Sequence, residues 1–280
     1  MSLLPRKEIS VALCPDKVVV VAWTKWLRRR VVSQAILPAT PSHASDWLPA
    51  LKILTEWLAD NEPGKADVTI LLSNSFVRFA MLPFSDDVSN RVERLTIAGL
   101  LFESIYGEAA KQWKLALDDE EYGEPSLVAA MDAALWDALN QVGLSGRLRK
   151  ISVRPYAASV VNAFRNQILS DNCLLTVIEH GQAIFFKIKG NKAVGVLKAN
   201  LKLNTAQEIS SLLQRELLIS GLSESGDARV YLHIAGNQNF IEAATISGVN
   251  LVCLQNDHSD SSAAADENPF YEMAFVEGLK

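Results

Sequence analysis

Hydrophobic periods along the chain predict one order of elements twice, about 165 residues apart. In each copy three short strands precede a helix and a further strand, and turn-forming residues such as Pro15-Asp16 and Gly190-Asn191 separate the strands. The first copy is predicted to have strands at 9–14, 17–23, 30–37 and 68–73, with a helix at 46–59. The second is predicted to have strands at 174–179, 183–188, 193–197 and 229–235, with a helix at 206–220. Two similar lobes would enclose a cleft.

The sequence between the two copies predicts an α-β module inserted into the first lobe. A strand at 76–82 precedes a long helix at 86–105, and strands at 113–117 and 126–131 form a hairpin. A helix beginning at Asp132 and a strand at 149–153 then lead back to the lobe. The long helix is predicted to bury a single stripe formed by Val88, Val92, Leu95, Gly99, Phe102 and Ile105.

These elements predict three regions. The first lobe spans 1–155 and includes the inserted module at about 86–148, and the second lobe spans 156–256. Residues 257–280 are predicted to form a flexible polar tail whose aromatic end docks back onto the body. Within the second lobe a helix at 157–168 is expected, and Thr205 with Glu208 matches a capping box at the start of the next helix.

Composition excludes several classes of protein. The chain has 280 residues, of which 49% are hydrophobic and 21% charged, so it is expected to be globular with a sizeable core. A net charge of −5 gives no basic footprint for nucleic acid. We found neither a membrane-spanning apolar run nor a signal peptide, and therefore expect a cytoplasmic protein without direct membrane insertion. The three cysteines are predicted to be reduced and buried, namely Cys14, Cys173 and Cys253.

Catalytic motifs are missing from the sequence. The four histidines share no spacing with other metal-ligating residues, so no metal site is predicted. The chain contains no phosphate-binding Gly-x-x-x-x-Gly-Lys-Ser/Thr loop, no Gly-x-Ser-x-Gly elbow and no dinucleotide fingerprint. The acidic run at 118–121 is interpreted as a hydrated hairpin loop.

One phrase of sequence suggests a family. Residues 71–84 read Leu-Leu-Ser-Asn-Ser-Phe-Val-Arg-Phe-Ala-Met-Leu-Pro-Phe, and Tyr106-Gly107 then precedes a strand that begins at Trp113. With the repeated β-β-β-α-β order, this resembles the PilM/MshI/GspL-like branch of the actin-like ATPase superfamily, the platform proteins of type IV pili and type II secretion. The resemblance implies an α/β fold of two ribonuclease-H-like lobes with an α-β insertion in the first.

The same resemblance directs attention to the turns that hold a nucleotide in that superfamily. In this chain the corresponding positions are degenerate: Asp16 and Lys17 in the first turn, Glu179, His180 and Gly181 in the second, and Gly236 in the third. Pro15 removes a backbone donor from the first turn, and no glycine there permits close approach of a phosphate. ATP hydrolysis is therefore not expected, whereas residual ATP/Mg binding at Lys17, Gly181 and Gly236 stays open beside their ordinary role as turn residues. Nuclease activity is not expected either, because the strand at 9–14 offers no inward carboxylate.

The resemblance implies a non-catalytic cytoplasmic scaffold of a type IV pilus or type II secretion assembly platform. Such a scaffold would bind a short cytoplasmic peptide of a single-span inner-membrane partner and so lie at the inner membrane through that partner. The alternative is an actin-fold ATP-binding protein, an ATPase or a small-molecule kinase. The sequence leaves open whether the chain also forms homo-oligomers.

Overall fold

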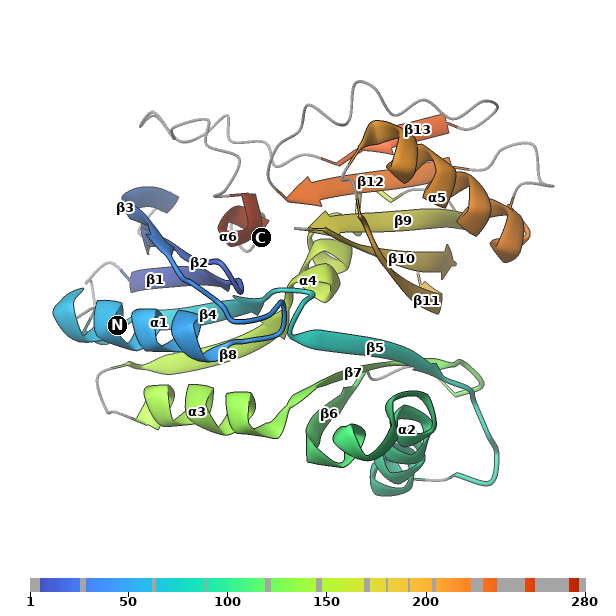
Figure 1. Ribbon diagram of the computed structural model, residues 1–280, viewed down its shortest axis with the longest axis horizontal. Helices are drawn as coiled ribbons and strands as arrows, with labels where there is room; N and C mark the ends of the chain where they lie inside the picture. The colour runs from blue at the N-terminus through green and yellow to red at the C-terminus, as the bar shows by residue number, and fades with distance from the viewer. Residues whose placement is uncertain are drawn as a thin grey trace.

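The fold contains three β-sheets joined by helices (Figure 1). The computed structural model describes residues 6–25, 29–61, 64–88, 90–118, 122–144, 148–168, 172–179, 181–190, 192–202, 205–222, 229–235, 250–254 and 272–276. Structural statements below refer to these residues.

The first sheet has the strand order β3-β2-β1-β4-β8. Strand β2, next to the central strand β1, contains four consecutive valines, which are buried because the sheet is covered on both faces. Helices α1 (Leu48–Asn61) and α3 (Ala133–Leu144) pack on one face through Leu54 and Leu135. The strands are β1 (Arg6–Leu13), β2 (Lys17–Lys25), β3 (Arg29–Pro38), β4 (Asp67–Leu72) and β8 (Lys150–Pro155).

The second sheet has the order β11-β10-β9-β12-β13. Helix α5 (Ala206–Ser220) covers one face through Ile209, Leu213 and Leu217. The strands are β9 (Asn172–Glu179), β10 (Gln182–Lys189), β11 (Lys192–Asn200), β12 (Arg229–Ala235) and β13 (Asn250–Cys253).

The two sheets have the same topology. In each, the first three strands form antiparallel pairs, and the first strand is also parallel to the fourth, which is parallel to the fifth. The predicted duplication and the two-lobed α/β fold class are therefore confirmed.

A third, smaller sheet forms the inserted module, with the order β5-β7-β6. Its strands are β5 (Val77–Leu82), β6 (Trp113–Leu117) and β7 (Ser126–Asp132), and β6 and β7 form the expected hairpin. Helix α2 (Arg91–Tyr106) and the short 3₁₀ helix η1 (Gly107–Gln112) pack beside this sheet. The domain boundaries at 155 and 256 stay predictions.

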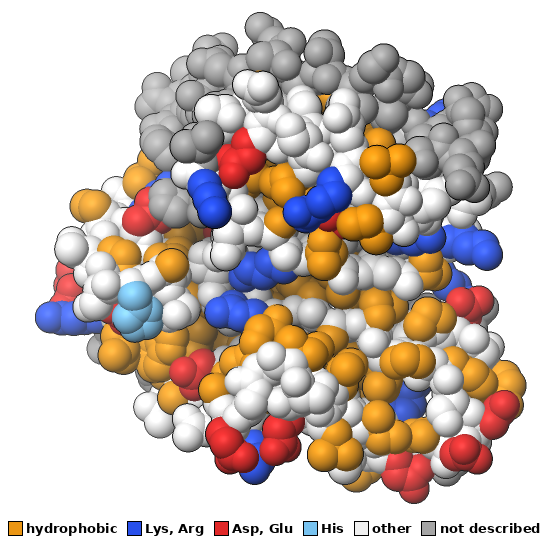
Figure 2. All heavy atoms as spheres, turned by 45° about the vertical axis from the view of Figure 1, so that its right-hand side comes forward, with side chains coloured by type: hydrophobic (Ala, Val, Ile, Leu, Met, Phe, Trp, Pro, Cys, Tyr) orange, Lys and Arg blue, Asp and Glu red, His pale blue; other side chains and the backbone are white. Residues whose placement is uncertain are grey.

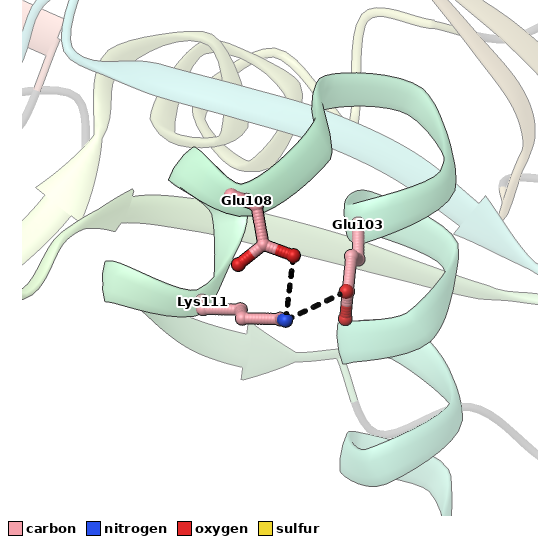
Figure 3. Close-up of polar contacts among 3 residues, drawn as sticks. All are labelled: Glu103, Glu108 and Lys111. Atoms are coloured by element: carbon pink, nitrogen blue, oxygen red, sulfur yellow. Dashed lines mark hydrogen bonds and ion pairs between the residues drawn. The ribbon is translucent and has the colours of Figure 1, made fainter.

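A charged contact fixes the turn between α2 and η1 (Figure 3). The Lys111 ammonium lies 2.8 Å from a Glu108 carboxylate oxygen and 3.1 Å from one of Glu103, so one cation joins the last turn of α2 to η1. Both carboxylates raise the pKa of Lys111 through hydrogen bonds. Gly107 makes the turn itself, with a positive φ of 70°.

The predicted stripe of α2 is partly wrong. The helix begins at Arg91 because Asn90 caps it by accepting hydrogen bonds from the backbone N–H groups of Val92 and Glu93. Ala98 and Phe102 are fully buried, whereas Val92 is 74% and Ile105 56% exposed. At about 100° per residue, Val92 lies about 80° around the helix from Phe102, outside the face that meets the sheet.

A shared apolar core lies between the two large sheets (Figure 1). Helices α4 (Tyr156–Ala163) and α6 (Glu272–Phe275) pack into it between the lobes, and α4 ends five residues before the predicted limit at 168. Met273, Ala274 and Val276 are buried, so this described part of the tail docks onto the body as expected, whereas 255–271 and 277–280 lie outside the described residues.

Buried polar groups in this core are joined by a histidine. The Tyr156 hydroxyl lies 2.7 Å from Nε2 of His233, and Nδ1 of His233 lies 3.0 Å from the carbonyl oxygen of Leu254. Since a carbonyl can only accept, Nδ1 of His233 donates to Leu254. His233 thus connects α4, β12 and the end of β13.

Two further local predictions can be compared with the structure. Thr205 caps α5 by accepting from the Glu208 N–H, but the Glu208 carboxylate accepts from the backbone of Lys202, so only one half of the capping box forms as predicted. Cys14 and Cys173 are buried free thiols as expected, and Cys253 is half-buried.

We predict that Phe102→Ala destabilises the protein by about 3 to 5 kcal/mol, because it empties a fully buried position of the inserted module. Val92→Ala on the same helix should change the free energy of unfolding by less than about 0.5 kcal/mol, since Val92 is exposed. Urea denaturation of both variants measures the difference. Equal losses would contradict the orientation of α2.

Candidate functional site between the lobes

The turns that follow the first strand of each lobe border the candidate site. In the β1–β2 turn the Cys14 N–H donates to the Lys17 carbonyl at 3.0 Å, and the Lys17 ammonium lies 3.5 Å from the Asp16 carboxylate. In the β9–β10 turn Gly181 has a φ of 76°, and its carbonyl accepts from Leu201 at 2.7 Å. Asp16, Lys17 and Gly181 therefore have turn-forming contacts in this structure.

Glu179 connects the two lobes. It ends β9 in the second lobe and is only 4% exposed, and its Oε2 accepts a hydrogen bond of 2.7 Å from the backbone N–H of Asn74 in the first lobe. Burial raises the pKa of the Cys14 thiol well above its usual value, and the nearby Glu179 carboxylate adds to this rise. The charge of Lys17 lowers the pKa of the same thiol, and that of Asp16 raises it. Three of the sequence-predicted positions, Asp16, Lys17 and Glu179, thus lie near Cys14.

The loop between β4 and β5 is the first-lobe half of this junction. Ser73, Asn74 and Ser75 are all buried, although all are polar. The Ser73 N–H donates to Leu13 at 3.0 Å, and the Ser73 hydroxyl and carbonyl accept from Ser75 and Phe76. The loop thus keeps its backbone groups paired while it passes between the lobes.

Lys198 supplies the second contact to this loop. From β11 its Nζ donates a 2.5 Å hydrogen bond to the Asn74 carbonyl, so Asn74 has its backbone N–H and its C=O bound by the second lobe. Burial, assisted by the positive charge of Arg78, lowers the pKa of Lys198 to about 7, against the opposing effect of Glu179. We name the contacts among Asn74, Glu179 and Lys198 the inter-lobe clasp.

The side chain of Asn74 has an unusual environment. It is fully buried, and neither Nδ2 nor Oδ1 has a hydrogen-bond partner among the described residues. An amide in this state is stabilised when water or another polar group enters the junction.

The residues of the junction do not form a phosphate cradle. The first turn contains Pro15, which has no N–H, and the Cys14 N–H is already bound within the turn. One oxygen of the Glu179 carboxylate, Oε2, already accepts from the backbone of Asn74. These described residues therefore fit Mg-ATP poorly. The two other predicted positions, His180 and Gly236, lie outside the described residues.

Sequence reasoning missed Asn74 and Lys198. Asn74 lies between the predicted strands 68–73 and 76–82, and its own residue type gave no sign of a contact with the second lobe. Lys198 on β11 pairs with Ile184 on β10, and the Ile184 side chain belongs to the shared core. The adjacent Leu197, in contrast, is 43% exposed. An inward lysine beside an outward leucine reverses the usual pattern of a strand. That reversal was the available signal.

Comparison with known proteins gives the fold. No family model and no curated protein matches the sequence. Solved structures do match: the PilM-PilN type IV pilus biogenesis complex contains a chain with a TM-score of 0.65 and 13% identity, over 98% of each chain. A Bacteroides thetaiotaomicron protein with an actin-like ATPase fold and unknown function gives 0.61 and 12% identity, over 88% of this chain and 91% of that one. This chain has an actin-like ATPase fold.

The similarity extends to a secretion protein. The cytoplasmic domain of EpsL, an inner-membrane component of the type II secretion system of Vibrio cholerae, gives a TM-score of 0.52 at 11% identity, over 88% of this chain and 85% of that one. The resemblance to PilM-like and GspL-like proteins is thus confirmed at the level of the fold. In the described part of the chain, no helix combines the length and apolarity needed to cross a bilayer.

We predict that stability depends on pH through Lys198. Above pH 7 folded Lys198 has lost its proton, whereas the unfolded chain keeps it up to the usual pKa of 10.5. Lys198 should therefore contribute to the free energy of unfolding a rise of up to about 1.4 kcal/mol per pH unit between about pH 7.5 and 9.5. Lys198→Met should remove this rise in urea titrations, and Lys114→Met, at an exposed lysine, should retain it. The same slope in both variants would refute the assignment.

We also predict different effects of two substitutions at Glu179. Glu179→Gln keeps an acceptor for the Asn74 N–H, whereas Glu179→Leu leaves that buried donor without one. The leucine variant should therefore lose about 1 to 3 kcal/mol more of unfolding free energy than the glutamine variant. Chemical denaturation near neutral pH measures this difference, and its absence would show that the clasp does not contribute to stability.

Proposed function

We propose that this chain is a non-catalytic scaffold of a type IV pilus or type II secretion assembly platform. The observation that carries the proposal is the match to a chain of the PilM-PilN complex along 98% of both chains, which includes the inserted module. The similar domain of EpsL comes from an inner-membrane component of a secretion system. We place the chain in the cytoplasm, at the inner membrane through a partner.

The proposed partner is a single-span membrane protein that contributes a short cytoplasmic peptide. The poor fit of the first turn to Mg-ATP supports a binding role over catalysis, since Pro15 has no backbone N–H and the Cys14 N–H is already bound within the turn.

The inserted module provides a suitable surface. Three apolar side chains of α2 are largely exposed, Val92 at 74%, Leu100 at 61% and Ile105 at 56%, and Ile97 and Tyr106 are each 39% exposed. Figure 2 shows hydrophobic side chains gathered at the lower right, where Figure 1 places α2 and the small sheet. Peptides that bind in apolar grooves use anchors of this kind.

We predict that a fluorescent peptide with the sequence of the cytoplasmic tail of a single-span platform protein, to be sought among the genes adjacent to the one for this chain, binds saturably in an anisotropy titration. Leu100→Arg should weaken binding at least about tenfold, because it places a charge within the apolar surface. Leu218→Arg is the matched control, since Leu218 is 69% exposed on α5 of the other lobe.

The outcomes separate the two functions. Absence of binding, or an equal loss in both variants, would contradict peptide docking on the module. Calorimetric titration with Mg-ATP should give little heat, whereas micromolar binding with turnover would support the alternative of an ATPase or kinase.

A further inference from the structure

The edge of the first sheet at which β1, β4 and β8 begin is rich in basic residues. Strand β2 ends and β3 begins at the same edge, because each is antiparallel to the strand before it. We name the eight basic positions of the described chain at this edge the basic edge. They are Arg6, Lys7, Lys25, Arg29, Arg30, Lys65, Arg149 and Lys150.

The basic edge crosses all five strands of the sheet. Arg6 on β1 pairs with Lys25 on β2, and Lys25 pairs with Arg29 on β3. On the other side of β1, Lys65 lies two residues before β4, and Lys150 begins β8. Adjacent strands lie about 4.8 Å apart, so five strands extend over about 19 Å. A single small anion would meet only part of such a row.

Carboxylates at this edge are fewer than cations. They are Glu8, Asp60 and Asp67, and eight cations against three carboxylates give the described residues of the edge a net charge of +5. The Arg149 guanidinium binds Asp67, with Nε to Oδ1 at 2.6 Å. Helices α1 and α3 also end a few residues before β4 and β8. A partial charge of about −0.5 at each helix C-terminus leaves the edge positive.

Four cations of the basic edge are exposed to solvent, namely Arg30, Lys65, Arg149 and Lys150. Arg149 is engaged with Asp67, but within the described part of the chain no carboxylate forms an ion pair with Arg30, Lys65 or Lys150. Surface charges that no neighbour neutralises set the potential that an approaching anion meets.

Negative charge is concentrated in the inserted module. Residues 77–132 contain eleven Asp and Glu against five Lys and Arg, a net charge of −6. Figure 1 places this module at the lower right and the beginnings of β1 and β8 at the left. The molecule is therefore dipolar, and its net charge of −5 would repel a long polyanion that reached past the basic edge. A flat anionic surface that meets this edge alone avoids that repulsion.

We propose that the basic edge binds the anionic phospholipid surface of a membrane. Lysine and arginine side chains would contact the headgroups of several lipids at once, without insertion into the bilayer. The inference rests on the proposed function for the nearness of a membrane, but it uses other residues than the exposed face of α2. A partner tail docked on α2 would then have to extend along the first lobe, which sets a minimum length for that tail.

Flotation of the full chain with phospholipid vesicles tests the proposal. Vesicles of equal parts phosphatidylglycerol and phosphatidylcholine should bind it with an association constant on the order of 10³ M⁻¹, because each of the five net charges contributes about fivefold. Vesicles of phosphatidylcholine alone should not bind it. Raising KCl from about 0.1 M to about 1 M should release the chain, since the Debye length falls from about 10 Å to about 3 Å.

Two triple variants with the same total charge locate the contact. Reversal of three exposed cations of the edge, in Arg30→Glu/Lys65→Glu/Lys150→Glu, should weaken binding at least about a hundredfold. The matched control reverses three exposed lysines of the module and the second lobe, in the variant Lys114→Glu/Lys189→Glu/Lys202→Glu. It should bind within about threefold of the wild type, since charges farther than a Debye length from the bilayer are screened.

Three outcomes would overturn the proposal: no binding of the wild-type chain to anionic vesicles, equal losses in the two triple variants, or tighter binding to a short DNA duplex than to the vesicles. Should the edge variant not fold in urea titrations, Lys65→Glu alone, in the turn before β4, is expected to weaken vesicle binding at least about fivefold. Failed vesicle binding with intact peptide binding would refute the basic edge and leave the scaffold role standing.

Discussion

The shared apolar core between the two large sheets is the constraint on which this molecule depends. Each sheet has its own helix-covered face, and among the described residues the facing sides are buried against each other, against α4 and α6, and against Phe79 and Leu127 of the inserted module. The lobes therefore cannot separate without exposing side chains such as Phe186 and Tyr156 to water. Apolar packing alone does not specify which residues of the two lobes meet. The two hydrogen bonds of the inter-lobe clasp do so, because they bind the backbone of Asn74 in the β4–β5 loop to the second lobe.

The duplicated frame has diverged most on the surfaces that face inward. In the register of the two sheets, Cys14 in the first lobe and Glu179 in the second occupy equivalent positions at the end of the first strand. One is an inert thiol and the other a carboxylate that crosses to the opposite lobe. The helix-covered faces of both lobes, in contrast, are mainly apolar. Function in such a fold is therefore expected where the two copies differ, not where they agree.

Most of the fold could be predicted from the sequence, because strands with alternating or continuous apolar residues end at recognisable turns. The orientation of α2 could not, since apolar residues occur all around that helix and a period alone does not choose between Val92 and Ala98 as the buried side. The clasp could not be predicted either. The reversed pattern of β11 marks Lys198 as unusual, but Lys198 binds a backbone carbonyl 124 residues away, and nothing in its strand identifies that partner.

The position of α6 has a consequence for how the chain is made. Met273 lies 3.5 Å from Cys14 across 259 residues of sequence, and α6 packs against β1 and β2. During synthesis the part of β1 and β2 that α6 covers therefore stays exposed until α6 has left the ribosome. Partly made chains with exposed apolar strands are prone to aggregate. Nascent chains of this protein are accordingly expected to be most prone to aggregation before α6 emerges.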